Sequence, residues 1–142
     1  MKYVIDASIG FKWEVAEVHS DKAQQLRDDF RNAVHELLAP DLFPTEVANA
    51  LLVAERRGRL LPGQGPLFLA DVLTTLPPIH PSLPDLTPRA YAIAELAHAS
   101  VYDCLYVALA EREKCGLITA DDKLIKKLQP HFSFIVPLAS LP

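Results

Sequence analysis

The sequence predicts an α/β fold: one domain, residues 1–142, with a mainly parallel sheet of roughly five strands and helices on both faces. The chain has 142 residues, half of them hydrophobic, and a single core of that size buries roughly two-thirds of the unfolded surface. Five short apolar runs alternate with segments of helical periodicity. Strands that alternate with helices form right-handed βαβ crossovers onto a parallel sheet.

The five predicted strands are short and are bounded by residues that favour turns, as buried parallel strands tend to be. They are Tyr3–Ile5, Leu37–Ala39, Pro78–His80, Leu117–Thr119 and Phe134–Val136.

Helical patterns occupy most of the chain between these runs. They are predicted over residues 20–36, from after Asp41 to Arg57, from Thr87 to about His98, from Ser100 onward, and from about Asp122 to Gln129. Gly58 is placed to cap the second of these helices, and the Thr87-Pro88 pair is typical of a helix start. Seven of the twelve prolines fall between residues 62 and 88, which predicts a short helix flanked by loops.

Composition excludes several classes of protein. The formal net charge is −4, from 14 Lys and Arg against 18 Asp and Glu, and this acid excess argues against nonspecific coating of nucleic acid. The chain has two cysteines, Cys104 and Cys115. We expect both to be reduced thiols in a cytoplasmic protein. The N-terminal segment has no apolar leader, and no uncharged run free of proline approaches the length of a membrane span, so we expect no membrane association.

Acidic residues follow two of the predicted strands directly. Asp6 comes after the first strand, and Asp121 and Asp122 follow the fourth with only Ala120 between. Ligands of open parallel sheets bind outside the carboxyl ends of the strands. The alternative for each Asp is a helix N-cap, since a helix follows both strands.

Two further acids lie within helical segments. Asp103 is the only charged residue in VYDCLYVALA, residues 101–110, so we expect it on a largely buried helix, where an ionised carboxylate needs a cation or strong donors. A capping role together with Ser100 is the alternative. Glu46 and Asn49 lie one turn apart in PTEVANALL, and the alternative for both is a solvated helix surface.

One shared site explains these acids better than four separate structural roles. Carboxylates without Cys or His ligands suit Mg²⁺ or Mn²⁺, which activate water and stabilise the leaving oxygen in phosphodiester cleavage. No pair of histidines has metal-ligand spacing, no Ser-His-Asp order is present, and Gly63 and Gly65 lead into no phosphate-loop lysine.

The sequence resembles the PIN-domain family, and within it the VapC-like toxins of toxin–antitoxin pairs. The matching segments are YVIDASI at 3–9, PTEVANAL at 44–51, YDCLYVALAE at 102–111 and LITADDKL at 117–124. The resemblance implies a three-layer α/β/α domain that cleaves RNA with one or two Mg²⁺ or Mn²⁺ ions.

Carried over position by position, the resemblance also implies the roles of individual residues. The implied catalytic and metal-binding acids are Asp6, Glu46, Asp103 and Asp121, with Asp122 as an additional metal-binding acid and Ser8, Asn49 and Thr119 as supporting polar residues.

The implied partners are a VapB-like antitoxin protein, an RNA substrate and a second copy of the chain in a homodimer. The apolar helices predicted over residues 20–36 and 42–57 offer a groove for the antitoxin, although core packing is the other use of their side chains. The candidates for RNA binding are Lys123, Arg56 and Arg57, followed by Arg59, Lys126 and Lys127.

Three alternatives stay open at this point. The first is a PIN-domain nuclease that processes RNA without an antitoxin. The second is a receiver-like domain with an aspartyl nucleophile, against which the late position of the Asp121-Asp122 pair counts. The third is an inert interaction module, in which we would expect one or more of the four acids to be missing.

Overall fold

The computed structural model describes residues 1–142 and contains one five-stranded sheet. All strand pairs are parallel, and the order across the sheet is β3-β2-β1-β4-β5. The strands are β1 (Lys2–Ile5), β2 (Glu36–Pro40), β3 (Ile79–His80), β4 (Gly116–Thr119) and β5 (Ile135–Pro137). The predicted fold class and all five predicted strands are confirmed.

Seven α-helices and one short 3₁₀ helix connect and cover these strands. They are α1 (Ala7–Glu14), α2 (Ser20–Arg31), α3 (Phe43–Arg56), α4 (Gln64–Thr74), α5 (Leu86–Ala97), α6 (Val101–Glu113), α7 (Asp122–Leu128) and η1 (Leu138–Ser140). The helix predicted within the proline-rich stretch is α4.

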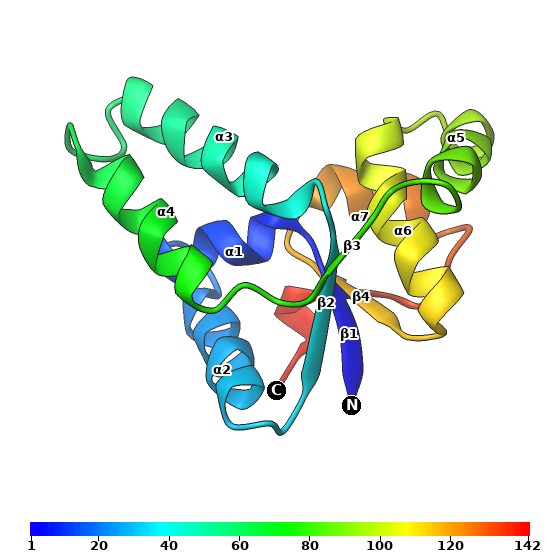
Figure 1. Cartoon of the computed structure of the whole chain (residues 1–142), viewed down its shortest axis with the longest axis horizontal. Helices are drawn as coiled ribbons and strands as arrows, with labels where there is room; N and C mark the ends of the chain where they lie inside the picture. Colours follow the sequence, from blue (N-terminus) through cyan, green and yellow to red (C-terminus); the bar gives the residue numbers. More distant parts are fainter.

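The helices form two layers around the sheet, which confirms the α/β/α arrangement. Helices α1 to α4 pack on one another on one side, and α5 packs along α6 on the other, where α6 also contacts β1, β2 and β4 (Figure 1). Both termini lie at the end of the sheet opposite to the carboxyl ends of the strands (Figure 1). The carboxyl ends are therefore free to carry a site.

The strand order reverses its direction between β1 and β4. From β1 the chain moves outward through β2 to β3, and it then crosses back to β4 on the other side of β1. Such a switch point leaves a crevice between the two strands, because the helices that follow them turn to opposite faces of the sheet. Asp6 and Ala120 are the first residues after β1 and β4.

Helix α2 is shorter than predicted, because it ends at Arg31 and not at residue 36. Ala33 adopts a positive φ of 58°, which ends the helix, and Val34 is 56% exposed in the turn that follows. Leu37 continues the apolar periodicity of α2 but lies in β2. The periodicity thus runs on by coincidence into the next strand.

Helix α5 begins at Leu86, with Asp85 at its N-cap, slightly earlier than the predicted Thr87-Pro88 start. The Thr87 hydroxyl donates to the carbonyl of Ser82 and so stabilises the preceding turn. A proline is tolerated in the first turn of a helix, where its missing N–H has no helical partner. The Thr87-Pro88 pair therefore lies in the first turn of α5 but does not contain the first residue of the helix.

Helix α6 is buried along its middle, as its all-round hydrophobicity predicts. Every residue from Cys104 to Ala110 is buried. Cys104 and Cys115 are both free thiols, which agrees with the prediction that they form no disulfide. No single helix is long and apolar enough to cross a membrane; α5 and α6 pass that test only as a pair bent by 114°.

Candidate active site

Asp6 is the centre of a hydrogen-bond network at the end of β1. It is the N-cap of α1 and accepts from the Ser8 backbone N–H at 3.2 Å, so the capping role considered above is real. The side chain is nevertheless only 4% exposed, and its Oδ1 also accepts from the Ser8 hydroxyl at 2.5 Å. Its second oxygen, Oδ2, accepts from the Thr119 hydroxyl at 2.5 Å.

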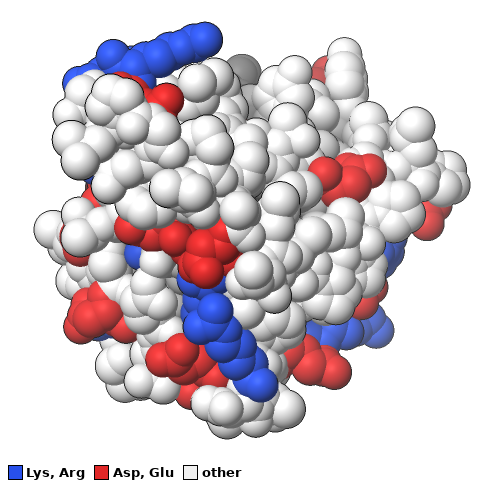
Figure 2. All heavy atoms as spheres, turned by 60° about the vertical axis from the view of Figure 1, so that its left-hand side comes forward, with Lys and Arg blue, Asp and Glu red and all other residues white.

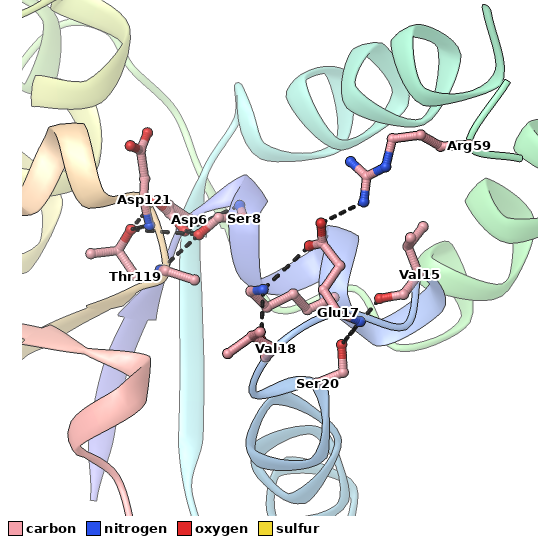
Figure 3. Close-up of polar contacts among 11 residues, drawn as sticks. Asp6, Ser8, Val15, Glu17, Val18, Ser20, Arg59, Thr119 and Asp121 are labelled. Carbon is pink, nitrogen blue, oxygen red and sulfur yellow. Dashed lines mark hydrogen bonds and ion pairs between the residues drawn. The ribbon is translucent and has the colours of Figure 1, made fainter. Parts of the chain in front are cut away.

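The two hydroxyls are themselves held by the loop after β4. Ser8 Oγ accepts from the backbone N–H of Ala120 at 2.9 Å, and Thr119 Oγ1 accepts from that of Asp121 at 3.0 Å. Each hydroxyl therefore donates a hydrogen bond to Asp6, and Figure 3 shows these contacts as dashed lines. The network joins β1 to β4 across the switch point and fixes the Asp6 carboxylate in one orientation.

Glu46 reaches the site from the first turn of α3. Its Oε1 accepts a 2.6 Å hydrogen bond from the Tyr106 hydroxyl, which comes from the buried part of α6. Glu46 is half-buried and forms no ion pair, so it is not the fully solvated helix glutamate of the alternative interpretation. Tyr106 thus sets the position of Glu46 from the opposite helical layer.

Asp103 and Asp121 stand at the starts of α6 and α7. Asp103 lies in the first turn of α6, where the Ser100 hydroxyl accepts from the Asp103 backbone N–H at 3.1 Å, so Ser100 does cap this helix. Asp121 is the N-cap of α7 and accepts from the backbone N–H of Lys123 at 3.0 Å and of Leu124 at 3.3 Å. Both acids keep further carboxylate lone pairs free for other partners.

The four acids act on one another electrostatically. Burial raises the pKa of Asp6 to about 7, the hydroxyls of Ser8 and Thr119 oppose that rise, and the charges of Asp121 and Asp103 add to it. Burial likewise raises the pKa of Glu46, against the Tyr106 hydrogen bond and with the charges of Asp103 and Asp121. Acids from four distant segments of the chain therefore lie close enough to repel one another.

Burial and the charge of Asp121 raise the pKa of Asp103, and Ser100 and Lys127 only partly offset this. None of the four acids takes part in any of the ion pairs of the structure. The cluster therefore holds negative charge that the protein's own cations leave largely uncompensated.

The donor set fits a hard divalent cation. It consists of carboxylate oxygens, which Mg²⁺ and Mn²⁺ prefer, and the hydroxyl bonds to Asp6 leave lone pairs on both of its oxygens. No three His, Cys, Asp or Glu side chains already surround a common point. Binding of an ion here would require these side chains to move, with water to complete the coordination, as it does for Mg²⁺ in most protein sites.

Other predicted residues lie outside this cluster. Asp122 is exposed and lines a second hollow, which Lys12, Thr119 and Ala120 also line. Asn49 is next to Glu46 in α3 and, with Arg57, lines a groove between α1 and α3. Arg56 and Lys123 are exposed, and neither lines the groove. Lys127, and not Lys123, is the α7 lysine whose charge lowers the pKa of Asp103.

The groove between α1 and α3 has a volume of about 630 Å³ and leads away from the acids. Ser8, Glu46 and Ala120 line it near the acids, and Lys12, Glu17, Arg57 and Arg59 line it farther along. The α2 helix contributes nothing to this groove, which α1 and α3 form. The groove connects an acidic end with a basic one.

Three residues of this site are absent from the predicted set: Tyr106, Lys12 and Glu17. Tyr106 follows Asp103 by three positions and so shares its helix face, which is the signal that could have found it. Lys12 follows Ser8 by four positions on α1. Nothing local indicates Glu17, because its role depends on a contact with Arg59, 42 residues away.

The fold and the site define a class: an α/β domain with a parallel sheet that carries an acidic cluster at its topological switch point. The sequence pattern of the PIN domain matches residues 3–128. The chain therefore belongs to the PIN-domain family.

Individual relatives agree with this assignment. Ribonuclease VapC3 of Pyrobaculum aerophilum is 33% identical in an alignment of 129 residues that covers 89% of this chain and 95% of that protein. The crystal structure of PAE2754 from Pyrobaculum aerophilum matches with a TM-score of 0.71 at 23% identity, over 99% of this chain and 85% of the other. VapC20 of Mycobacterium tuberculosis, described as a toxin that cleaves the sarcin–ricin loop, matches with a TM-score of 0.62 at 14% identity, over 87% and 93% of the two chains. These two structures share the fold.

Proposed function

We propose that this protein is a metal-dependent endoribonuclease that acts as the toxin of a toxin–antitoxin pair. The observation that carries the proposal is the uncompensated cluster of Asp6, Glu46, Asp103 and Asp121 around the switch point of a PIN-domain fold. The 33% identity to a ribonuclease over most of both chains supports the reaction. Asp122 is the candidate for an outer ligand, since it follows Asp121 directly.

Each side chain has a separate task in this proposal. Asp6 is held by Ser8 and Thr119 so that its free lone pairs face the site, and Tyr106 does the same for Glu46. Asp103 and Asp121 add charge and ligands from the opposite helical layer. When bound, one or two Mg²⁺ or Mn²⁺ ions supply Lewis-acid chemistry, which activates water and stabilises charge on the phosphate. Asn49 is placed to orient substrate or water in the groove.

The same proposal includes the setting in which the protein works. We infer a single PIN-like domain over residues 1–142, a VapB-like antitoxin that silences the enzyme, a cytoplasmic location and a homodimer. Exposed apolar side chains on α4 and α5, among them Leu67, Leu73, Tyr91 and Leu96, support association with another protein surface. Light scattering of the purified chain, alone and with the product of a neighbouring reading frame, measures both assemblies.

The receiver-like alternative disagrees with the fold. Receiver domains use the strand order 2-1-3-4-5, whereas this sheet has the order β3-β2-β1-β4-β5. A processing nuclease without an antitoxin has the same chemistry. It is distinguished by whether a partner protein copurifies with the chain and abolishes cleavage.

Cleavage of a folded RNA with single-stranded loops tests the reaction, because unpaired bases are the accessible targets in RNA. We expect cleavage with Mg²⁺ or Mn²⁺, none in excess EDTA, and none by Asp6→Asn or Asp103→Asn. Asp21→Asn is the matched control, because Asp21 is exposed on α2, which contributes no residue to the acidic cluster or to the groove, and it should retain full activity. Full activity of either site variant, or activity that persists in EDTA, would falsify the proposal.

A further inference from the structure

We propose that Lys12, Arg57 and Arg59 form a phosphodiester-binding subsite for RNA, and that the Glu17 carboxylate occupies this subsite in the free protein. The inference rests on the proposed function, since it concerns the RNA strand that enters the same groove. The three cations hold the strand, and an acid of the same chain competes with it.

Glu17 lies between two cations of the groove. Its Oε2 accepts from Arg59 Nη2 at 2.6 Å, and its Oε1 accepts from Lys12 Nζ at 3.2 Å. Figure 3 shows the Glu17 carboxylate below the Arg59 guanidinium, with the Asp6–Ser8–Thr119 network farther along toward β4. One anionic group therefore already bridges Arg59 and Lys12.

The Glu17 carboxylate is firmly ionised. Partial burial pushes its pKa upward, but the hydrogen bonds and charges of Arg59 and Lys12 outweigh this and hold the pKa of Glu17 below its usual value. A phosphodiester carries the same charge and offers the same kind of oxygen acceptors, and guanidinium groups bind carboxylates and phosphates in the same way. The site that binds Glu17 is therefore also a phosphate site.

The three cations have donors to spare. An ammonium group has three donors, and Lys12 uses two of them, on Glu17 and on the carbonyl of Val18 at 2.8 Å. Its side chain is only 13% exposed, so its position is set by the groove wall. Arg59 is 50% exposed and lies over the Phe11 ring. Arg57 lines the groove and forms none of the ion pairs of the structure.

The charge of the rest of the surface means that RNA has to be bound by a few local cations. The chain carries a net charge of −4, and Figure 2 shows separate acidic and basic patches on the face that comes forward, with no continuous basic surface. RNA binding depends mainly on cations that contact phosphates. The groove brings three such cations to a path that begins at the acids.

Only the side chain of Glu17 must move to release the subsite. Its backbone is held in the turn between α1 and α2, because the Glu17 N–H donates to Ser20 Oγ at 2.9 Å and the Glu17 carbonyl accepts from the Ser20 N–H at 3.1 Å. The RNA phosphate and Glu17 therefore compete for the same donors while the fold stays unchanged. Removal of the Glu17 charge should strengthen RNA binding.

The test is binding of a fluorescently labelled single-stranded RNA in EDTA, followed by anisotropy, so that the readout does not require cleavage. Glu17→Gln should bind about two- to fivefold more tightly, the range expected when the Glu17 charge no longer competes for the exposed guanidinium of Arg59. Arg57→Ala and Arg59→Ala should each bind more weakly and flatten the salt dependence, by about 0.7 in the log–log slope for each phosphate that the variant no longer neutralises.

Two matched controls accompany these variants. Glu111→Gln removes an acid from the exposed Arg89–Glu111 pair on α5 and α6, in which the nitrogen and oxygen are 2.7 Å apart, so it changes the net charge by the same amount outside the groove. Arg31→Ala removes an exposed arginine of α2, a helix that contributes no residue to the groove. Both should leave RNA affinity within about twofold of the wild type, as expected for surface changes.

The proposal is overturned if Glu17→Gln binds RNA no more tightly than wild type, or if Glu111→Gln tightens binding equally. It is also overturned if Arg57→Ala and Arg59→Ala bind normally, which keeps the test valid should Glu17→Gln fail to fold. The proposal is also overturned if these variants change the binding of a copurifying protein and leave RNA binding unchanged. The subsite would then belong to that protein. If the protein does not cleave RNA but the variants change RNA binding as expected, the proposed function is rejected and the subsite is supported.

Discussion

The hydroxyl of Thr119 donates a 2.5 Å hydrogen bond to Oδ2 of Asp6, from the end of β4 to the end of β1. The two residues are 113 positions apart in the sequence, and the parallel pairing of β1 with β4 brings them together. The bond lies at the topological switch point, where ligand sites of parallel sheets form. Because of this bond, Asp6 is not only the N-cap of α1 but also a buried carboxylate with a fixed orientation.

Thr119→Val should reduce RNA cleavage about 10- to 100-fold, the range found when a group that orients a metal ligand is removed. Valine keeps the shape of threonine but leaves Oδ2 of Asp6 without its donor. Thr119→Ser restores the hydroxyl and should recover most of the activity. Cleavage rates at saturating Mg²⁺, with thermal unfolding as the check on folding, measure the effect. Equal rates for valine and threonine would show that the bond is dispensable.

Tyr106→Phe should shift the pH dependence of cleavage. The Tyr106 hydrogen bond lowers the pKa of Glu46 against the effect of burial, so its loss raises that pKa further. If Glu46 acts ionised, activity is lost as the pH falls through its pKa. The acid limb of kcat/KM against pH should therefore move to higher pH in the variant. An unchanged limb with a uniformly lower rate would contradict this role and indicate a loss of packing alone.

Gly10→Ala should destabilise the fold and lower activity together. An added Cβ at Gly10 lies 2.9 Å from Phe43 Cζ and 2.9 Å from Val47 Cγ2, both fully buried on the turn of α3 that carries Glu46. Overpacking of this kind typically costs about 1–3 kcal/mol, partly offset by the roughly 0.5–1 kcal/mol that alanine gains over glycine in a helix.

Gly65→Ala is the control for this variant. The nearest atom to a Cβ there is the flexible carboxylate end of Glu55 at 3.1 Å. Urea denaturation should show a smaller loss of unfolding free energy for Gly65→Ala than for Gly10→Ala. The reverse order would mean that α1 and α3 can move apart freely.

Glu14→Gln should make stability less dependent on pH. Burial raises the pKa of Glu14 to about 7 from 4.5, Asp71 adds to the rise, and Arg27 opposes it. The folded state then binds more protons than the unfolded state between pH 4.5 and 7, so stability from this group is present at low pH and is lost as the pH rises to 7.

Urea denaturation at about pH 5 and about pH 8 in EDTA measures this slope. The wild type should lose more unfolding free energy between the two values than Glu14→Gln does. Asp6, whose pKa is also raised to about 7, contributes in the same direction, so a part of the slope should remain. An identical slope in both proteins would show that Glu14 stays ionised through its 3.0 Å contact with Arg27.

The strands and the acids could be predicted because their signals are local. Short apolar runs indicate all five strands, and an Asp directly after Tyr3–Ile5 or Leu117–Thr119 is readable from the sequence. The end of α2 could not be predicted, because its apolar periodicity continues to Leu37, and only the positive φ of Ala33 separates helix from strand. Turn geometry of that kind has no strong signal in an alanine.

The groove was harder to predict than the acids, because its lining depends on how two helices face each other. Arg56 and Arg57 are adjacent in the sequence, yet only Arg57 lines the groove. Lys12 pairs with Glu17 five residues away, but Arg59 reaches Glu17 only because the fold brings it there from beyond α3. Such contacts follow from tertiary packing and not from local sequence.

The most direct test of the central claim is anomalous X-ray diffraction from crystals of this protein soaked in Mn²⁺. We expect an anomalous peak within about 2.5 Å of carboxylate oxygens from at least two of Asp6, Glu46, Asp103 and Asp121. The peak should be absent in Asp6→Asn crystals prepared in the same way. No peak between these side chains in the wild type, or an equal peak in the variant, would contradict the claim that the four acids share a metal site.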